Sequence, residues 1–370
     1  MTRTASNGLD TSRNYNERVL RPARLVSLDV FRGLTMAAMV VVNNPGDWNN
    51  VYPPLLHAEW HGWTPTDLIF PFFVFIVGAA VTFSTRSLSW SSILRRGALI
   101  MAIGLLLNGY PKFDLDTWRI PGVLQRLAVC YVAAAALFKT TRGHARQGLV
   151  LAVAGLATIV AYHLLMMCVA PPGGTRGDLS PEGNLGAYVD RMLFGNHMWK
   201  PRWDPEGLLS TLPAIGTAVF GACAGLWLQS QAPPSRKAAG LLAAGVAGIA
   251  AGYLWNAWFP INKSLWSSSF VLFTAGAACL LLAACYWLTD IRGVRLTPLV
   301  ILGTNALALY VASSLLASTL ELHGGQHIYQ SWFAPLGSPR NTSLLFALAH
   351  LAVLFALLAW MYRRRIFLRV

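Results

Sequence analysis

The sequence predicts an all-α, polytopic integral membrane protein, a helical bundle with about ten transmembrane helices. Two observations carry this prediction. Of the 370 residues, 55% are hydrophobic and only 12% are charged, whereas soluble domains carry about 25% charged residues. Apolar stretches of about 20 residues, the length that crosses a bilayer as a helix, recur along the whole chain. Spans of this length are typical of helices rather than of membrane-barrel strands.

Taken in order, each candidate helix is an apolar stretch that ends in a polar or charged segment. The first apolar stretch carries Asp29 and Arg32 and is followed by no small-residue cleavage site, so we expect a membrane span rather than a signal peptide. The expected helices are 25–43, 66–86, 92–109, 120–138, 147–168, 208–229, 237–257, 265–287, 296–317 and 340–362. They form one transmembrane domain, residues 25–370, after a flexible basic cytoplasmic tail, residues 1–24.

Basic residues gather in alternate loops, which predicts the orientation of the bundle. With the N-terminus inside, the cytoplasmic segments hold nineteen lysines and arginines and the outer segments hold eight. This bias follows the positive-inside rule and predicts that both termini are cytoplasmic. The net charge of +14 therefore reflects topology, and we expect no nucleic-acid partner.

The outer loop 44–65 combines histidines and tryptophans with no lysine or arginine. His57, in LLHAEWHG, stands just before the second span, and histidine is the side chain that most readily takes up a proton near neutral pH. Glu59, His61 and Asp67 lie close enough in sequence to orient it. The alternative is an interfacial histidine bonded to backbone carbonyls. Although His57 and His61 have the spacing of a helical metal pair, no third ligand accompanies them, so we expect no metal.

Ionisable residues inside the spans are further candidates, because each costs at least about 2.5 kcal/mol near the bilayer centre. Asp29 and Arg32 lie three residues apart on the first helix, and an ion pair that holds this helix is the alternative to a functional role. Arg126, with Gln125, would bind a phosphate or a substrate hydroxyl, or serve as a buried structural arginine.

Polar residues at the ends of spans complete the set of candidates. An amide of Asn43 or Asn44 would donate to a thioester carbonyl or its oxyanion, or cap the helix. Asp204 and Glu206 precede the sixth helix and would otherwise complement its dipole. Weaker single signals come from Asn262, Lys263 and Asn305. The five cysteines lie in or at the ends of spans, as small apolar residues do.

Six ordered stretches resemble one family, the heparan-α-glucosaminide N-acetyltransferases and their bacterial NagX-like relatives. They are RLVSLDVFRGLTMAAMVVVNN, HAEWHGWTPTDLIFPFFVFIVG, RIPGVLQRLAVCYV, DPEGLLSTLPAIGTAVFGACAG, INKSLWSSSFVLFTAG and GTNALALYV. The resemblance runs from about residue 24 to the C-terminus. It implies transfer of acetyl from acetyl-CoA to the amino group of glucosamine across a membrane. The sequence NPGDWNN departs from the family's glycine-rich run and leaves the acceptor open.

The resemblance also implies roles for the candidate residues. His57, Asn43 and Asp67 would be catalytic. Acetyl-CoA, a co-substrate, would be bound by Arg32, Asn44, Gln125, Arg126 and Asn305. The amino sugar would be bound by Glu59, Asp204, Glu206, Asn262 and Lys263. His57 would act either as a general base or as a nucleophile that forms acetyl-histidine.

Two other functions stay open from sequence: a transporter of amino sugars or oligosaccharides, and an O-acyltransferase acting on envelope sugars. We expect a bacterial inner-membrane location with His57 towards the periplasm. The bilayer, acetyl-CoA and the amino sugar are the expected partners, and a second copy of the chain stays open as another.

Overall fold

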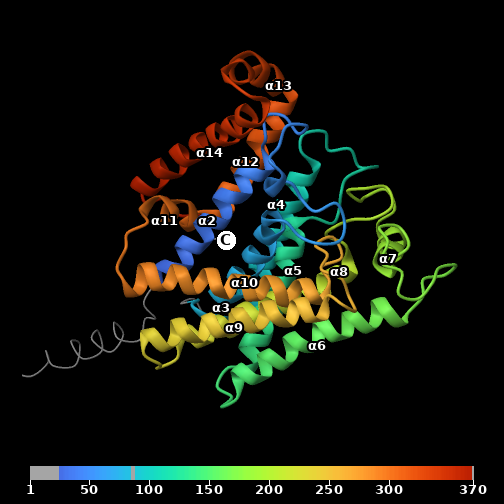
Figure 1. The fold of residues 1–370 in the computed structure, drawn as a ribbon, viewed down its shortest axis with the longest axis vertical. Helices are drawn as coiled ribbons and strands as arrows, with labels where there is room; N and C mark the ends of the chain where they lie inside the picture. The colour runs from blue at the N-terminus through green and yellow to red at the C-terminus, as the bar shows by residue number, and fades with distance from the viewer. Residues whose placement is uncertain (1–24, 85–87, 369–370) are drawn as a thin grey trace, which may run out of the picture.

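The computed structural model describes residues 25–84 and 88–368, and within them the chain is a bundle of helices with no β-strand (Figure 1). The helices are α2 (Val26–Asn43), α3 (Ile69–Thr82), α4 (Trp90–Gly109), α5 (Val123–Thr141), α6 (Gln147–Cys168), α7 (Leu185–Phe194), α8 (Leu208–Gln229), α9 (Pro234–Trp255), α10 (Ser268–Tyr286), α11 (Thr297–Thr304), α12 (Ala306–Leu322), α13 (Gly325–Ile328) and α14 (Pro339–Arg363). Short 3₁₀ turns cover Pro53–Leu55, Pro65–Leu68 and Ala334–Leu336, and π turns cover Trp287–Ile291 and Tyr329–Phe333.

The predicted all-helical membrane fold is confirmed. Nine helices of the described residues are long and apolar enough to cross a bilayer, and the bent pair of α11 and α12 makes a tenth candidate. The expected spans 147–168 and 208–229 coincide with α6 and α8. The predicted tail, residues 1–24, lies outside the described residues, and the cytoplasmic placement of the termini stays a prediction.

The expected span 296–317 is not one straight helix. It breaks at Asn305 into α11 and α12, which meet at an angle of 79°. The Asn305 side chain donates from Nδ2 to the Ile366 carbonyl and accepts from the Leu368 amide, both at 3.0 Å. An asparagine at the break thus ties the C-terminal segment to the interrupted helix.

Close helix packing in the centre of the bundle depends on glycine. A Cβ atom on Gly78 of α3 would lie 1.7 Å from the Ala218 carbonyl oxygen of α8, and one on Gly221 would lie 2.0 Å from the Phe75 carbonyl oxygen. Small residues allow backbones to approach this closely in a membrane, where dispersion rather than water drives association. α3 and α8 therefore form the inner layer.

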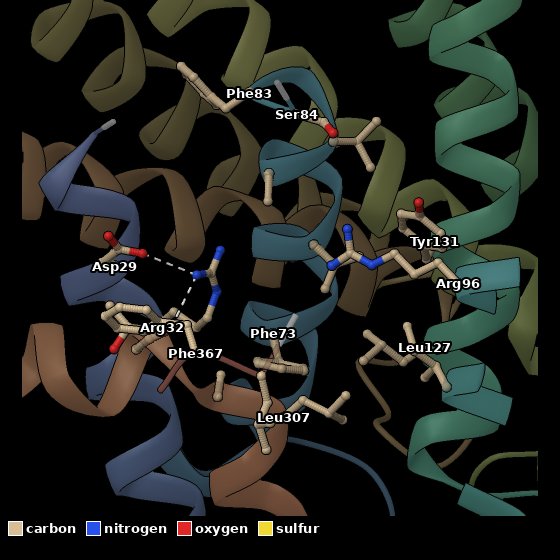
Figure 2. A pocket seen from close by; sticks show the side chains of 18 residues that line it. Asp29, Arg32, Phe73, Phe83, Ser84, Arg96, Leu127, Tyr131, Leu307 and Phe367 are labelled. Carbon is tan, nitrogen blue, oxygen red and sulfur yellow. Dashed lines mark hydrogen bonds and ion pairs between the residues drawn. The ribbon is translucent and has the colours of Figure 1, made fainter. Parts of the chain in front are cut away.

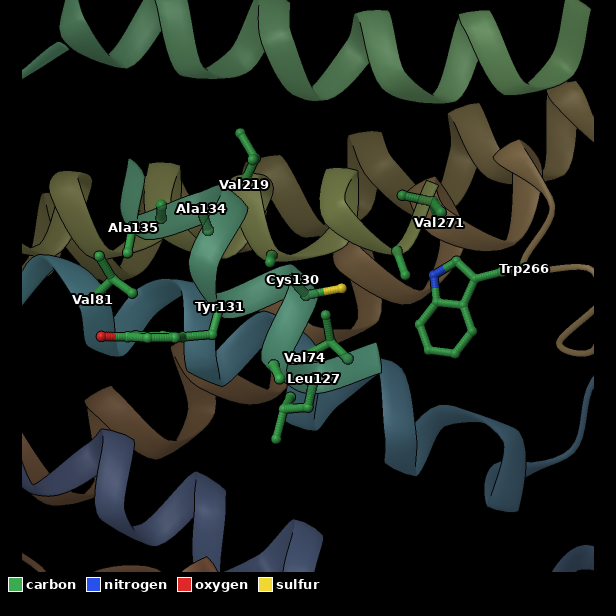
Figure 3. Close-up of a cluster of buried hydrophobic side chains, with 14 of the residues drawn as sticks. Val74, Val81, Leu127, Cys130, Tyr131, Ala134, Ala135, Val219, Trp266 and Val271 are labelled. Atoms are coloured by element: carbon green, nitrogen blue, oxygen red, sulfur yellow. The ribbon is translucent and has the colours of Figure 1, made fainter. Parts of the chain in front are cut away.

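The main apolar core lies around α3, α5, α8 and the start of α10. Figure 3 shows Val74 of α3 close to Leu127 and Cys130 of α5, with the Trp266 indole to one side, and Val219 of α8 belongs to the same buried cluster. α4, α6 and α9 are much less buried and lie outside this core, and α14, which is also little buried, packs against α2, α11 and α12. α7, which the sequence analysis did not predict, lies in the long connection between α6 and α8.

We predict that Gly78→Ala destabilises the bundle, because the added methyl has no space against α8. Overpacking a core costs about 1–3 kcal/mol. Gly148→Ala is the matched control, since a Cβ there would meet nothing within 4 Å. Thermal unfolding in detergent should show a lower midpoint for the Gly78 variant alone, and equal midpoints for both variants would contradict this packing.

Candidate active site

A cavity of about 280 Å³ lies at the end of the bundle where α2 ends and α3 begins. The apolar part of its wall includes Met36, Phe70 and Phe73. Its polar lining includes Thr35, Asn43, His57, Arg119, Glu206, Lys263 and Tyr310. Of the thirteen predicted site residues, the structure brings His57, Asn43, Glu206 and Lys263 directly to this cavity.

His57 and Asp67 form the central contact of the site. His57 Nδ1 lies 2.7 Å from Asp67 Oδ1, while 48% of the imidazole and only 1% of the carboxylate are exposed. An ionised carboxylate only accepts hydrogen bonds, so the ring donates from Nδ1. The neutral ring then keeps its lone pair on Nε2. The geometry presents a histidine with one fixed tautomer to the cavity.

The local sequence explains how the loop reaches this position. Thr64 is the N-cap of the 3₁₀ turn that leads into α3, and its backbone amide donates to Asp67 Oδ2 at 2.9 Å in a capping box. The Ala58 amide donates to the same oxygen at 3.0 Å. Thr66 Oγ1 donates to the Pro54 carbonyl at 3.1 Å. The histidine loop is thereby fastened across the start of α3.

Lys263 extends from the loop between α9 and α10 and closes on the imidazole. Its Nζ lies 3.1 Å from both His57 ring nitrogens and 4.0 Å from Asp67 Oδ1. Because Nδ1 is engaged by Asp67, Nε2 is the nitrogen that can accept from the lysine. Burial lowers the pKa of Lys263 below its ordinary value, and the charges of Glu206 and Asp67 oppose that decrease. Lys263 thus adds a partly buried cation beside Nε2.

Lys263 is held by a tight turn that Asn262 organises. Asn262 is fully buried. Its side-chain Oδ1 accepts from the Leu265 backbone amide at 2.8 Å, and its backbone amide donates to Ser267 Oγ at 3.0 Å. Its Nδ2 lies 3.4 Å from His61 Nδ1. Asn262 therefore links the lysine turn to the histidine loop without lining the cavity.

The opposite wall is an ion-pair cluster around Arg119. Its Nε and Nη2 donate to the two oxygens of Asp204 at 2.9 and 2.7 Å, and Nη2 also donates to Glu206. Burial tends to raise the pKa of Asp204, but the hydrogen bonds and charge of Arg119 outweigh this effect and lower it. Burial likewise tends to lower the pKa of Arg119, but Asp204 and Glu206 raise it. The guanidinium also lies 5.1 Å from the Trp199 ring. This cluster holds Glu206 at the cavity wall.

Two neighbouring asparagines at the end of α2 have different surroundings. Asn43 is exposed and lines the cavity. Asn44 is buried, and its Nδ2 donates to the Val40 carbonyl at 2.6 Å and to Ser313 Oγ of α12 at 3.3 Å. Asn43 is therefore the amide available to a bound group, whereas Asn44 connects α2 to α12.

A second cavity, of about 400 Å³, lies nearer the other end of α2 (Figure 2). Arg32 and Arg96 line it, and Figure 2 shows them extending from α2 and α4 toward its interior. Arg32 Nη1 donates to Asp29 Oδ1 and to the Gly303 carbonyl, both at 3.2 Å. Phe73 lines both this cavity and the one at His57, so one side chain stands where the two cavities adjoin.

Several predicted residues have other surroundings. Arg126 is 2% exposed, donates to the Gly207 carbonyl at 3.1 Å and to Ser210 Oγ, and lies 5.0 Å from the Trp266 ring. Its Nε and Nη1, and Nε2 of Gln125, have no hydrogen-bond partner in the described part of the chain. These groups do not line the two cavities.

Glu59 is exposed, and the carboxylate that the His57 ring hydrogen-bonds among the described residues is that of Asp67. Asn305 binds the C-terminal segment, as described above. Sequence reasoning missed Arg119 as a site residue, although Arg119 opens the RIPGVLQRLAVCYV stretch, because nothing near it in the sequence marks its carboxylate partners. Among residues 25–84 and 88–368, no group of three or more histidine, cysteine, aspartate or glutamate residues could hold a metal ion.

The fold and this cavity define a class: a polytopic helical membrane protein with an oriented histidine in a cavity between its spans. A family model, heparan-alpha-glucosaminide N-acetyltransferase, catalytic, matches residues 24–180. The heparan-alpha-glucosaminide N-acetyltransferases of Homo sapiens and Mus musculus are 29% and 30% identical to the chain over 360 and 363 residues. These matches cover 78% and 79% of this chain, but 52% and 54% of the relatives.

The chain is similar to the heparan-alpha-glucosaminide N-acetyltransferases over most of its length, and this similarity supports the family that its motifs predicted. It spans about half the length of the curated relatives that it matches. His57, Asp67 and Asn43 all lie within the residues that the family model matches.

A buried carboxylate beside the site gives a pH-dependent prediction. Asp190 of α7 accepts from the Leu208 amide at 2.8 Å, at the start of α8. Burial raises its pKa from 3.8 to about 6. The folded protein therefore holds this proton more tightly than the unfolded chain, so stability falls as the pH rises from about 4 to about 6.

Asp190→Asn keeps an acceptor for Leu208 and removes the titration. The variant should gain stability relative to the wild type between pH 4 and 7, by about 1–3 kcal/mol. Thermal unfolding in detergent at pH 4 and at pH 7 measures the difference in stability between the variant and the wild type. Asp116→Asn is the control, because Asp116 is exposed. A stability difference that does not change with pH would contradict the assignment.

Proposed function

We propose that the protein is a membrane-embedded acetyltransferase that moves acetyl from acetyl-CoA to the amino group of glucosamine or of a glucosamine-ended sugar. The observation that carries the proposal is the His57 ring, held by buried Asp67 through Nδ1 while it lines a cavity between the spans. The names of the similar human and mouse proteins support the same chemistry.

The donor fits the two adjoining cavities. Acetyl-CoA carries phosphates at one end and a thioester at the other, joined by a long pantetheine arm. In our proposal Arg32 and Arg96 attract the phosphates, because guanidinium groups suit phosphate oxygens. The arm passes Phe73, which lines both cavities. The thioester then reaches the cavity that contains His57 and Asn43.

His57 acts through Nε2, and two routes use the same geometry. As a general base it takes a proton from the acceptor nitrogen, which attacks the thioester carbonyl; the carbon–sulfur bond breaks and the proton passes to the departing thiolate. As a nucleophile Nε2 attacks the thioester carbonyl, the carbon–sulfur bond breaks and CoA leaves as the thiolate; the amine then attacks the acetyl group, the bond to Nε2 breaks, and the freed imidazole takes up the proton of the amine. Asp67 holds the ring in the required tautomer along either route.

The other polar groups of the cavity fit the charges that develop. The carbonyl oxygen becomes negative during attack, and Asn43 and Lys263 supply a donor and a cation in the same cavity. Glu206, held by Arg119, supplies an anion for the amino group of the sugar. The apolar wall excludes water that would hydrolyse the thioester.

The sidedness of the reaction rests on the distribution of charge in the loops. The positive-inside bias supports an orientation with the phosphate-attracting arginines towards the cytoplasm and His57 towards the outer face. We propose the bacterial inner membrane as the location, with the acceptor arriving from the periplasm.

The test is His57→Ala, with His61→Ala as the matched control from the same loop, since His61 does not line the cavity. Purified protein in liposomes receives labelled acetyl-CoA and glucosamine. The His57 variant should form no labelled N-acetylglucosamine, because the proton acceptor is gone, while the His61 variant should retain most activity. Unchanged turnover by the His57 variant would defeat the assignment.

The same assay separates the rival functions. Label on the sugar nitrogen supports N-acetyl transfer. Label on a sugar hydroxyl would favour an O-acyltransferase, and sugar flux with no release of CoA would favour a transporter.

A further inference from the structure

A third cavity, of about 410 Å³, lies on the other side of α3, among α3, α8, α9 and α10. Its α3 contribution is Phe75, which is two positions from Phe73 and therefore on the opposite face of the helix. The rest of the wall is apolar or small, and includes Cys223, Ala224, Gly240, Ala244 and Gly248. This cavity belongs neither to the His57 site nor to the arginine-lined cavity.

The cavity exists because α9 packs tightly against α10 and loosely against α8. A Cβ atom on Gly248 would lie 2.9 Å from the Gly276 Cα, so the backbones of α9 and α10 are almost in contact. α8 meets α9 near their connecting turn, where Trp227 Nε1 donates to the Lys237 carbonyl at 2.9 Å. Beyond that turn the two helices leave a groove between them.

The groove opens at the surface of the bundle. Ala244 lines it and is exposed. Of the apolar stretch of α9, only 17% is buried, against 67% for α8. Both helices are candidate membrane spans, so lipid hydrocarbon faces the opening. An acyl chain is the ligand whose chemistry matches an apolar groove at this depth.

The end of the groove next to the turn carries positive charge. Trp227 and Gly240 line that end, and Arg236 and Lys237 stand in the first turn of α9 beside them. Residues 230–239 contain no aspartate or glutamate. From Gly240 to Gly248 the helix rises about 12 Å, which is within one leaflet of a hydrocarbon core about 30 Å thick. The groove therefore reaches from a basic headgroup level into one leaflet.

We propose that this groove binds one acyl chain of an anionic phospholipid whose phosphate is held by Arg236 and Lys237. Basic residues at the ends of spans attract anionic headgroups, and the groove adds a place for the chain. The site is independent of acetyl transfer and does not rest on the proposed function.

The experiment measures lipid binding to the purified full-length protein in detergent by native mass spectrometry. Phosphatidylglycerol and phosphatidylcholine with the same acyl chains are compared. Ala244→Trp fills the groove and should lower the affinity for both lipids about tenfold or more, because an acyl chain and an indole cannot share the space. Val246→Trp is the control, since Val246 lies on α9, is 59% exposed and does not line the groove.

The headgroup is tested by the double variant Arg236→Gln and Lys237→Gln. One basic side chain near the headgroup is worth about fivefold in affinity for anionic lipid, so the preference for phosphatidylglycerol should fall about twenty-five-fold. An unchanged affinity for phosphatidylglycerol would overturn the phosphate assignment.

Two results would overturn the assignment of the groove to a lipid acyl chain. The first is equal lipid binding by the Ala244→Trp and Val246→Trp variants. The second is loss of a dimer in Ala244→Trp with lipid binding intact, which would assign the groove to a second copy of the chain. If the tryptophan variant does not fold, Ala244→Leu gives the same test with a smaller side chain.

Discussion

The carboxylate of Asp67 is the contact on which the site depends. It stands at the start of a membrane span, is almost fully buried, and accepts hydrogen bonds from the Thr64 and Ala58 amides and from the His57 ring. A buried charge is tolerated only when its oxygens have donors. The histidine loop and the segment that leads into α3 therefore meet at one group. The beginning of α3, the path of the histidine loop and the tautomer of the imidazole are set together.

The bundle around this contact is close-packed in some directions and open in others. Glycines bring α3 against α8, and Gly33 and Gly303 bring α2 against α11, where an added Cβ would lie 1.9 Å from a carbonyl oxygen of the facing helix. Space remains between α2, α3, α5 and α12, where the two adjoining cavities lie. The break at Asn305 turns α12 away from α11 and lets the C-terminal segment reach the second cavity.

The sequence predicted the spans well because length and apolar content decide whether a segment crosses a bilayer. It did not predict the break at Asn305, because the apolar residues on both sides of Gly303-Thr304-Asn305 together have the length of one span. His57 and Asp67 were predicted as partners from their closeness along the chain, and the structure places them in hydrogen-bond contact. Arg119 was missed, because its carboxylate partners lie more than 80 residues away. Residue chemistry alone did not separate Asn43 from Asn44, and only the resemblance gave them different roles. One residue rotates a side chain by about 100° around a helix, so the packing of α12 is needed to show which asparagine faces it.

The most direct measurement is the rate of acetyl transfer to glucosamine by Asp67→Asn, in the purified protein, beside His57→Ala and the double variant. The amide keeps the size of the side chain but no longer holds the imidazole as a charged acceptor. Loss of such a carboxylate lowers the rate by about a thousandfold or more when it fixes the tautomer of a catalytic histidine. We predict that loss for Asp67→Asn, and no further loss when it is added to His57→Ala, because the two residues act as one unit. A folded Asp67→Asn protein that transfers acetyl at nearly the wild-type rate would contradict the account.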